Sequence, residues 1–156
     1  MKSQIIPNYT DLSLLSSSSL VSELADSQSC LSGAGLFPVD TLIYPYGKRN
    51  SSTDQAAIDV WFIWARTDNR GYNSKDTNKF ALFGQTVQKE TSLTQLKNWI
   101  DTAYNDKTWT ILIFHKINTT WEAYSFDTNT FSELIDYIVA KNINMVTIHE
   151  GITQMN

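Results

Sequence analysis

The chain of 156 residues lacks several features that mark common classes of protein. It has one cysteine, Cys30, so no disulfide can form within the chain. Its basic residues cluster no more densely than at Lys48-Arg49 and its net charge is −4, which argues against nucleic acid and anionic membranes as partners. No apolar stretch approaches the roughly 20 residues of a membrane span, and no signal peptide is visible after Lys2.

Metal ligands and charges are also scarce. Two histidines, His115 and His149, with a single cysteine are too few for a structural zinc site, so we expect no metal or other cofactor. Charged residues make up 18% of the chain, below the usual share of about a quarter, and serine, threonine and asparagine supply most of the polar surface. Such compositions are common in surface and virion proteins, so we expect an extracellular, cell-surface or virion location.

The apolar content is sufficient for a folded protein. Hydrophobic residues make up 42% of the chain and aromatic residues 12%, enough for a sizeable core at this length. No internal repeat or linker divides the sequence, so residues 1–156 are predicted to form a single domain. Cys30 lies in a helical pattern beside Leu31, and we expect it to be buried or half-buried.

Helical and strand patterns alternate along the whole chain. Apolar stripes of helical period predict helices over 18–31, 52–58, 92–104 and 130–141. The last helix is expected to have Thr130 as its N-cap and Glu133 as the partner in a capping box. Apolar runs rich in β-branched and aromatic residues predict strands over 41–44, 60–66, 80–87, 110–114 and 145–148. This alternation predicts an α/β fold with parallel strands and outer crossover helices, in an open sheet or a barrel.

The ends of the predicted strands carry the candidate functional residues, because functional groups collect at the carboxyl ends of parallel strands. These residues are Tyr46, Arg66, His115, and His149 with Glu150. We expect Tyr46, Arg66 and His115 to open onto one rim. The alternatives are that His115 is a hydrogen-bonded strand-end residue and that Arg66 forms an ion pair with Asp68 or Glu150. His149 is expected to be a surface residue.

The aromatic residues divide into two groups. Trp61, Trp64, Trp99 and Trp109 are predicted to lie in the core. Trp121 stands in a polar loop after His115, where it is the better candidate for a flat surface on which a sugar ring stacks.

Three motifs occur in an ordered set along the chain: Tyr44-Pro45-Tyr46-Gly47, Ala65-Arg66-Thr67 and Ile111-Leu112-Ile113-Phe114-His115. In order and spacing they resemble the later motifs of the polysaccharide deacetylases, the NodB-homology or family 4 carbohydrate esterases. The stretch 11–27 also resembles the helix that follows the metal-binding loop of that family, and 131–147 resembles its last helix and strand.

The resemblance implies part of a deformed (β/α) barrel that removes acetyl groups from N- or O-acetylated sugars with a zinc ion bound by one Asp and two His. It implies that the backbone N–H of Tyr46 faces the oxyanion and that His115 protonates the leaving group. It also implies that Arg66 replaces an arginine that often precedes the Pro-Tyr-Gly motif, where Ile43 stands here. If the groove still binds sugar, we expect stacking contacts from the aromatic residues Tyr44, Tyr46, Trp121 and Tyr124. Arg66 and His115 would add hydrogen bonds to an acetamido group.

The chain departs from the family at the metal site. The Thr-Phe-Asp-Asp-Gly segment of the family would lie upstream of residue 1, so the chain resembles the C-terminal part of the domain. Ile5 and Tyr9 fill the two histidine positions of the metal-binding loop. All three metal ligands that the family uses are therefore missing or replaced.

We interpret the chain as a catalytically inactive deacetylase-like domain that recognises acetylated cell-surface glycan, or serves structurally, in a surface or phage tail protein. One alternative is part of an active N-acetylglucosamine deacetylase completed by further residues or another chain. Another is a pure assembly module. Because a partial barrel exposes sheet edges, we expect a homo-oligomer or a partner chain.

Overall fold

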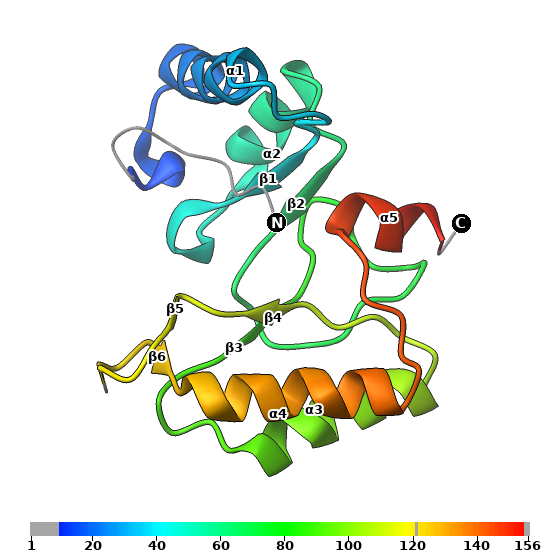
Figure 1. The fold of residues 1–156 in the computed structure, drawn as a ribbon. Coiled ribbons are helices and arrows are strands. Elements are labelled where there is room, and N and C mark those ends of the chain that lie inside the picture. Colours follow the sequence, from blue (N-terminus) through cyan, green and yellow to red (C-terminus); the bar gives the residue numbers. More distant parts are fainter. Residues whose placement is uncertain (1–9, 121, 155–156) are drawn as a thin grey trace. The chain divides into compact units, whose positions relative to one another are not determined.

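The computed structural model describes residues 10–120 and 122–154 (Figure 1). The chain forms two compact units, and each unit is built from several separate stretches of the sequence. Of the described residues, unit 1 holds those up to Asn69 together with Thr77–Leu82 and Thr147–His149, and unit 2 holds those in Arg70–Asp76, Phe83–Val146 and from Glu150 onward. Within the described ranges, none of the helices combines the length and the apolar character that crossing a membrane requires.

Unit 1 alternates helices with short strands. Its elements are η1 (Leu12–Leu14), α1 (Ser17–Gly33), β1 (Thr41–Ile43), η2 (Pro45–Gly47), α2 (Ser51–Asp59) and β2 (Trp64–Arg66). β1 and β2 are parallel, with Leu42 opposite Ala65, and Leu82 continues the pairing through a parallel bridge to Arg66. The parallel strand pairing that the sequence predicted is thus confirmed in this unit.

Side-chain caps explain where the helices of unit 1 begin. The Ser16 hydroxyl accepts a hydrogen bond from the backbone N–H of Ser19 and starts α1. Asn50 and Thr53 form a reciprocal capping box at the start of α2. Both helices lie where the sequence predicted them, with bounds shifted by one or two residues.

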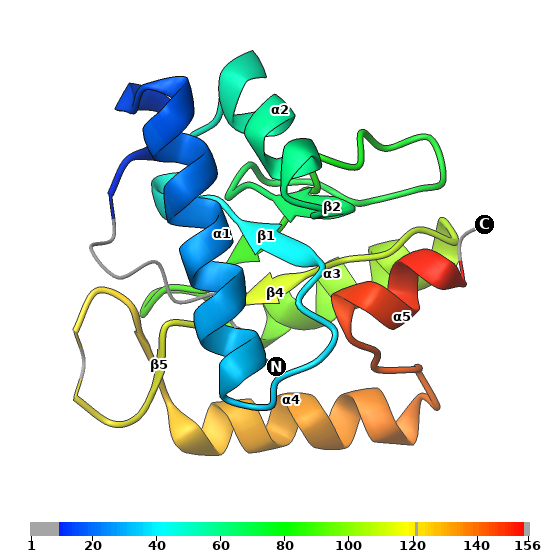
Figure 2. The same ribbon diagram turned by 90° about the horizontal axis from the view of Figure 1, so that it is seen from above.

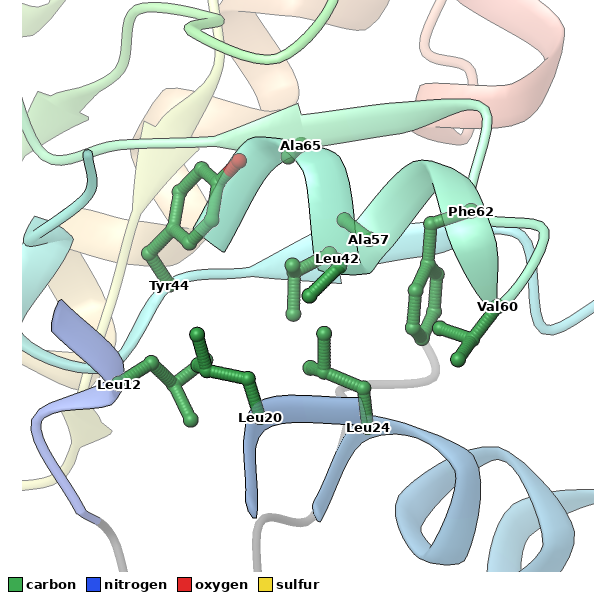
Figure 3. Packing of buried hydrophobic residues seen from close by; sticks show 10 residues of the cluster. Leu12, Leu20, Leu24, Leu42, Tyr44, Ala57, Val60, Phe62 and Ala65 are labelled. Atoms are coloured by element: carbon green, nitrogen blue, oxygen red, sulfur yellow. The ribbon is translucent and has the colours of Figure 1, made fainter. Parts of the chain in front are cut away.

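The core of unit 1 lies between these helices and the β1–β2 pair. Figure 3 shows Leu20 and Leu24 of α1 pointing toward Leu42 of β1. Ala57 supplies a small contact from α2 and is fully buried. At about 25 cal/mol per Å² of apolar surface removed from water, each such buried leucine contributes roughly 1.5 to 3 kcal/mol.

The junction between α2 and β2 differs from the sequence prediction. The strand predicted over 60–66 begins only at Trp64, because Val60 and Trp61 complete a helix C-terminus in which the N–H of Trp61 bonds to Ile58 and that of Phe62 to Ala57. Trp61 has a φ of 69° and is 83% exposed, so its assignment to the core was wrong. Its ring is left outside because the left-handed turn buries Phe62 in its place.

Unit 2 contains the second set of elements. They are β3 (Gln85–Thr86), α3 (Leu93–Asn105), β4 (Leu112–Ile113), β5 (Lys116–Ile117), β6 (Ser125–Phe126) and α4 (Thr128–Ala140). β3 pairs in parallel with β4, and β5 pairs in parallel with β6. α3 and α4 lie side by side (Figure 1), and their stripes enclose a core that includes Leu96 and Leu134.

Two internal contacts organise unit 2. Asn73, fully buried, donates from Nδ2 to the Phe83 carbonyl at 3.0 Å and accepts at Oδ1 from the Phe83 N–H at 2.9 Å. The Phe114 ring packs 5.5 Å from that of Phe126 and edge-on, at 5.1 Å, to that of Phe131. The polar loop around Asn73 is therefore tied into the fold, which its composition did not indicate.

Other expectations about the fold were wrong. Segment 145–148 does not form a strand: Met145 is 56% exposed and a helix, α5 (Ile148–Thr153), begins at the end of the segment. The N-cap of α4 is Asp127, which accepts from Thr130, so Thr130 is inside the helix. Cys30 is exposed, because it lies on the outer side of α1.

The fold is α/β, and helices α1 to α4 and strands β1 to β4 follow the predicted order, whereas β5, β6 and α5 lie where none of these elements was predicted. The described residues form three two-stranded sheets, and no closed sheet is present among them. The deformed barrel that the resemblance implied is therefore not shown. A single domain over 1–156 stays a prediction.

Candidate functional site

The Pro-Tyr-Gly turn follows β1 in unit 1 and has an unusual backbone. Tyr46 adopts φ 57° and ψ 17°, a left-handed conformation that is rare for a bulky residue and often occurs at functional sites. Gly47 follows with φ 66°, and a Cβ at this position would collide with the Asp68 carboxylate. The turn is closed by the N–H of Gly47, which bonds to the Tyr44 carbonyl at 3.0 Å. The Tyr46 side chain is 56% exposed.

Tyr44 lies beneath this turn and not on its surface. Its side chain is 2% exposed, and its hydroxyl donates to Asp54 Oδ1 at 2.8 Å. Arg49 also binds the Asp54 carboxylate, through Nε at 3.0 Å and through Nη2. Burial is the main cause that raises the pKa of Tyr44 well above its ordinary value, and the hydrogen bond to Asp54 raises this pKa further. In this position the Tyr44 ring offers no open face to a sugar.

Arg66 ends β2 and is half-buried. Its Nη1 donates to the Thr67 carbonyl at 2.9 Å. Thr67 is buried and donates from Oγ1 to the Leu82 carbonyl at 3.1 Å, so the Ala-Arg-Thr motif is fixed by main-chain partners. The predicted ion pair of Arg66 with Asp68 or Glu150 stays a prediction.

His115 follows β4 in unit 2 and forms a ring pair with Tyr124. The ring centroids are 4.7 Å apart and the planes are tilted by 44°. Both side chains are exposed, Tyr124 by 48%. The N–H of Lys116 bonds to the Tyr124 carbonyl at 3.2 Å, which fixes the two segments beside each other. The pair therefore presents two adjacent aromatic rings at the carboxyl end of β4.

A cavity of about 500 Å³ opens next to the β5–β6 ribbon in unit 2. The beginnings of α3 and α4 both reach it, and β5 lies near the beginning of α4 (Figure 2). Its lining includes Lys89, Ser92, Asn118, Phe126, Asp127 and Glu133. The sequence predicted a helix start close by, with Thr130 as N-cap and Glu133 as its capping-box partner, but it indicated no binding site at these residues.

The predicted site residues are thus divided between the two units. Tyr46 and Arg66 belong to unit 1, and His115 and Tyr124 belong to unit 2, where they are in contact. The shared rim for Tyr46, Arg66 and His115 stays a prediction. Trp121, the predicted sugar platform, lies outside the described residues, as do Ile5 and Tyr9 at the replaced histidine positions.

The zinc that the resemblance implies finds no ligand set among the described residues. In 10–120 and 122–154, no three side chains of His, Cys, Asp or Glu gather closely enough to hold a metal ion. His149 instead lies with Nδ1 2.6 Å from Asp40 Oδ2, and its side chain is 43% exposed. No chemical step through a metal follows from these residues.

Comparison with known proteins gives a likeness of fold. No family model matches the chain, and no curated protein matches it. Among solved structures, the chain is similar to the Streptococcus pyogenes deacetylase PplD in complex with acetate, with a TM-score of 0.54 and 24% sequence identity. The match covers 58% of this chain and 40% of that deacetylase, so the chain spans well under half of the deacetylase. The chain therefore has a deacetylase-like fold.

Proposed function

We propose that this chain is a catalytically inactive, deacetylase-like domain that binds acetylated cell-surface glycan, as part of an extracellular surface protein or a phage tail. The observation that carries the proposal is the exposed pair of His115 and Tyr124 rings at the carboxyl end of β4. Ligands of α/β proteins bind at the carboxyl ends of the strands. The likeness to a deacetylase favours an acetylated ligand over other ring compounds.

The chemistry of the two rings suits a sugar. The Tyr124 face can stack on the apolar face of a pyranose, while its hydroxyl and the His115 nitrogens can hydrogen-bond to ring hydroxyls or an acetamido group. A contact of this kind contributes on the order of 1 kcal/mol, so a single site binds weakly. Useful affinity then requires several copies acting together, which fits a surface or tail protein.

Loss of catalysis is supported by the sequence. Ile5 and Tyr9 stand where the polysaccharide deacetylases carry the two metal-binding histidines, and neither side chain is a zinc ligand of the usual kind.

We also propose that the chain works as a homo-oligomer or with a partner chain. A sedimentation run at micromolar concentration that shows only monomer would contradict the homo-oligomer.

Titration with N-acetylglucosamine oligomers tests the binding proposal. Wild type should bind, and Tyr124→Ala should lose at least several-fold in affinity, because a stacking contact worth about 1 kcal/mol is removed. Tyr104→Ala is the matched control: Tyr104 is 62% exposed near the C-terminal end of α3 and is not part of the ring pair, so its loss should leave binding unchanged. Equal binding by Tyr124→Ala and wild type would refute the proposal.

A second candidate, a fragment of an active deacetylase, is favoured by Tyr46. Its left-handed backbone is a strained feature of the kind that active sites retain. Acetate release from an N-acetylglucosamine oligomer with added zinc, abolished by His115→Ala, would establish this candidate in place of the inactive one.

A further inference from the structure

The cavity in unit 2 is the immediate neighbour of the His115–Tyr124 pair along the β5–β6 ribbon. The N–H of Lys116 bonds to Tyr124, and two residues further the N–H of Asn118 bonds to Phe126 at 3.0 Å. Asn118 and Phe126 both line the cavity. Two residues of extended chain advance about 7 Å, so a ligand longer than one ring that lies on the pair reaches the cavity.

The charges around the cavity disfavour an anionic ligand, because its lining carries two carboxylates, Asp127 and Glu133, and one cation, Lys89. Two helices point their N-termini at it, but both termini are already capped: Ser92 Oγ accepts from Gln95 N–H at 3.1 Å and Asp127 Oδ1 from Thr130 N–H at 2.8 Å. Hydrogen bonds from Thr130 hold the pKa of the Asp127 carboxyl below its usual range, so the group is ionised at neutral pH. Asp127 and Glu133 outnumber Lys89, so the net charge of the lining is negative and repels an anion.

The other lining groups fit a polyhydroxylated ring. Glu133 offers a carboxylate acceptor from the first turns of α4. Asn118 Oδ1 accepts hydrogen bonds from Thr120, from its N–H at 3.2 Å and its Oγ1 at 2.9 Å. The amide nitrogen of Asn118 is therefore the group that can donate to a ligand. Phe126 supplies an apolar wall. A sugar ring presents hydroxyls that both donate and accept, together with an apolar face.

We infer that this cavity is a second sugar subsite, which holds the uncharged pyranose ring adjacent to the one stacked on Tyr124. The inference rests on the proposed function for the class of ligand, and it adds that the site spans at least two rings. Glu133 and Asn118 are the residues that hydrogen-bond to the second ring. Both are specificity-determining residues for oligomer length.

Calorimetric titration with N-acetylglucosamine and its tetramer tests the inference. The tetramer should bind wild type about tenfold more tightly than the monosaccharide, since a second subsite adds contacts of its own. Glu133→Gln and Asn118→Asp should each remove most of that gain, while binding of the monosaccharide stays as in wild type. Asn118→Asp keeps the acceptor oxygen that Thr120 uses and removes the donor.

Asp136→Asn is the matched control for Glu133→Gln, because Asp136 is exposed on the same helix, lies outside the cavity lining and carries the same charge. It should keep the full tetramer gain. A gain that persists in both Glu133→Gln and Asn118→Asp overturns the second subsite and leaves the proposed function standing. Failure of wild type to bind either sugar overturns the proposed function, and this inference with it.

Discussion

The hydroxyl of Tyr44 donates to Asp54 Oδ1 at 2.8 Å beneath the Pro-Tyr-Gly turn, and Arg49 Nε donates to the same oxygen at 3.0 Å. This three-residue network joins the end of β1 to the first turn of α2. The Tyr44 carbonyl also closes the turn around Tyr46 by accepting from the Gly47 N–H. The network explains why Tyr44, an aromatic residue predicted to contact a ligand, is instead part of the core.

Tyr44→Phe should destabilise unit 1 by about 1 kcal/mol, because the ring still fills its space while the hydrogen bond to Asp54 is lost. Denaturant unfolding followed by circular dichroism measures the change. Tyr104→Phe, at an exposed position, should have no effect. A loss in Tyr44→Phe no larger than in Tyr104→Phe would mean that the network contributes nothing to stability.

The ionised carboxylate of Asp101 should contribute to the free energy of unfolding, and this contribution should depend on pH. Its carboxylate accepts from Lys141 Nζ at 2.6 Å and from the Tyr137 hydroxyl at 2.6 Å, and these bonds hold its pKa below the usual range. A carboxyl whose pKa is lowered on folding stabilises the protein above its unfolded pKa of about 4, and that stabilisation is lost as the pH falls further. Asp101→Asn should flatten the loss of stability between about pH 4 and 2.

Acid titration of the melting temperature checks this contribution. Asp136→Asn, also on the surface of unit 2, should keep the acid slope of wild type. Identical slopes for Asp101→Asn and wild type would show that the contact between α3 and α4 does not depend on this carboxylate.

Asn73→Ala should be among the most damaging substitutions of a polar residue in unit 2. The side chain is fully buried and satisfies both the N–H and the carbonyl of Phe83, so its removal leaves two half-buried backbone groups without this partner. The expected cost is about 2 to 3 kcal/mol in the free energy of unfolding. Asn98→Ala, on the exposed side of α3, should cost far less; comparable losses would contradict the assigned role.

Trp61→Gly should leave stability unchanged or raise it by up to about 1 kcal/mol, because glycine adopts the positive φ at a helix end without strain. The 83% exposed ring makes little contact that could be lost. Trp61→Ala removes the same ring but keeps a Cβ, so it should be less stable than Trp61→Gly. Thermal melts that rank alanine above glycine would argue against backbone strain at this position.

Local sequence determined helices α1 to α4 and their order. Ser16, Asn50 and Ser92 cap helices close to where the sequence placed them, because a cap and an apolar stripe act within a few residues of each other. The apolar runs that precede Arg66 and His115 also carried enough signal to predict the parallel strands β2 and β4.

The candidate sites needed the tertiary structure. His115 and Tyr124 are separated by eight intervening residues, and only the pairing of β5 with β6 brings their rings to 4.7 Å. The burial of Tyr44 and the exposure of Trp61 were decided by a distant carboxylate and by a left-handed turn, neither of which leaves a periodic pattern in the sequence. Long-range contacts of this kind depend on which surfaces meet, and composition and spacing do not encode that choice locally.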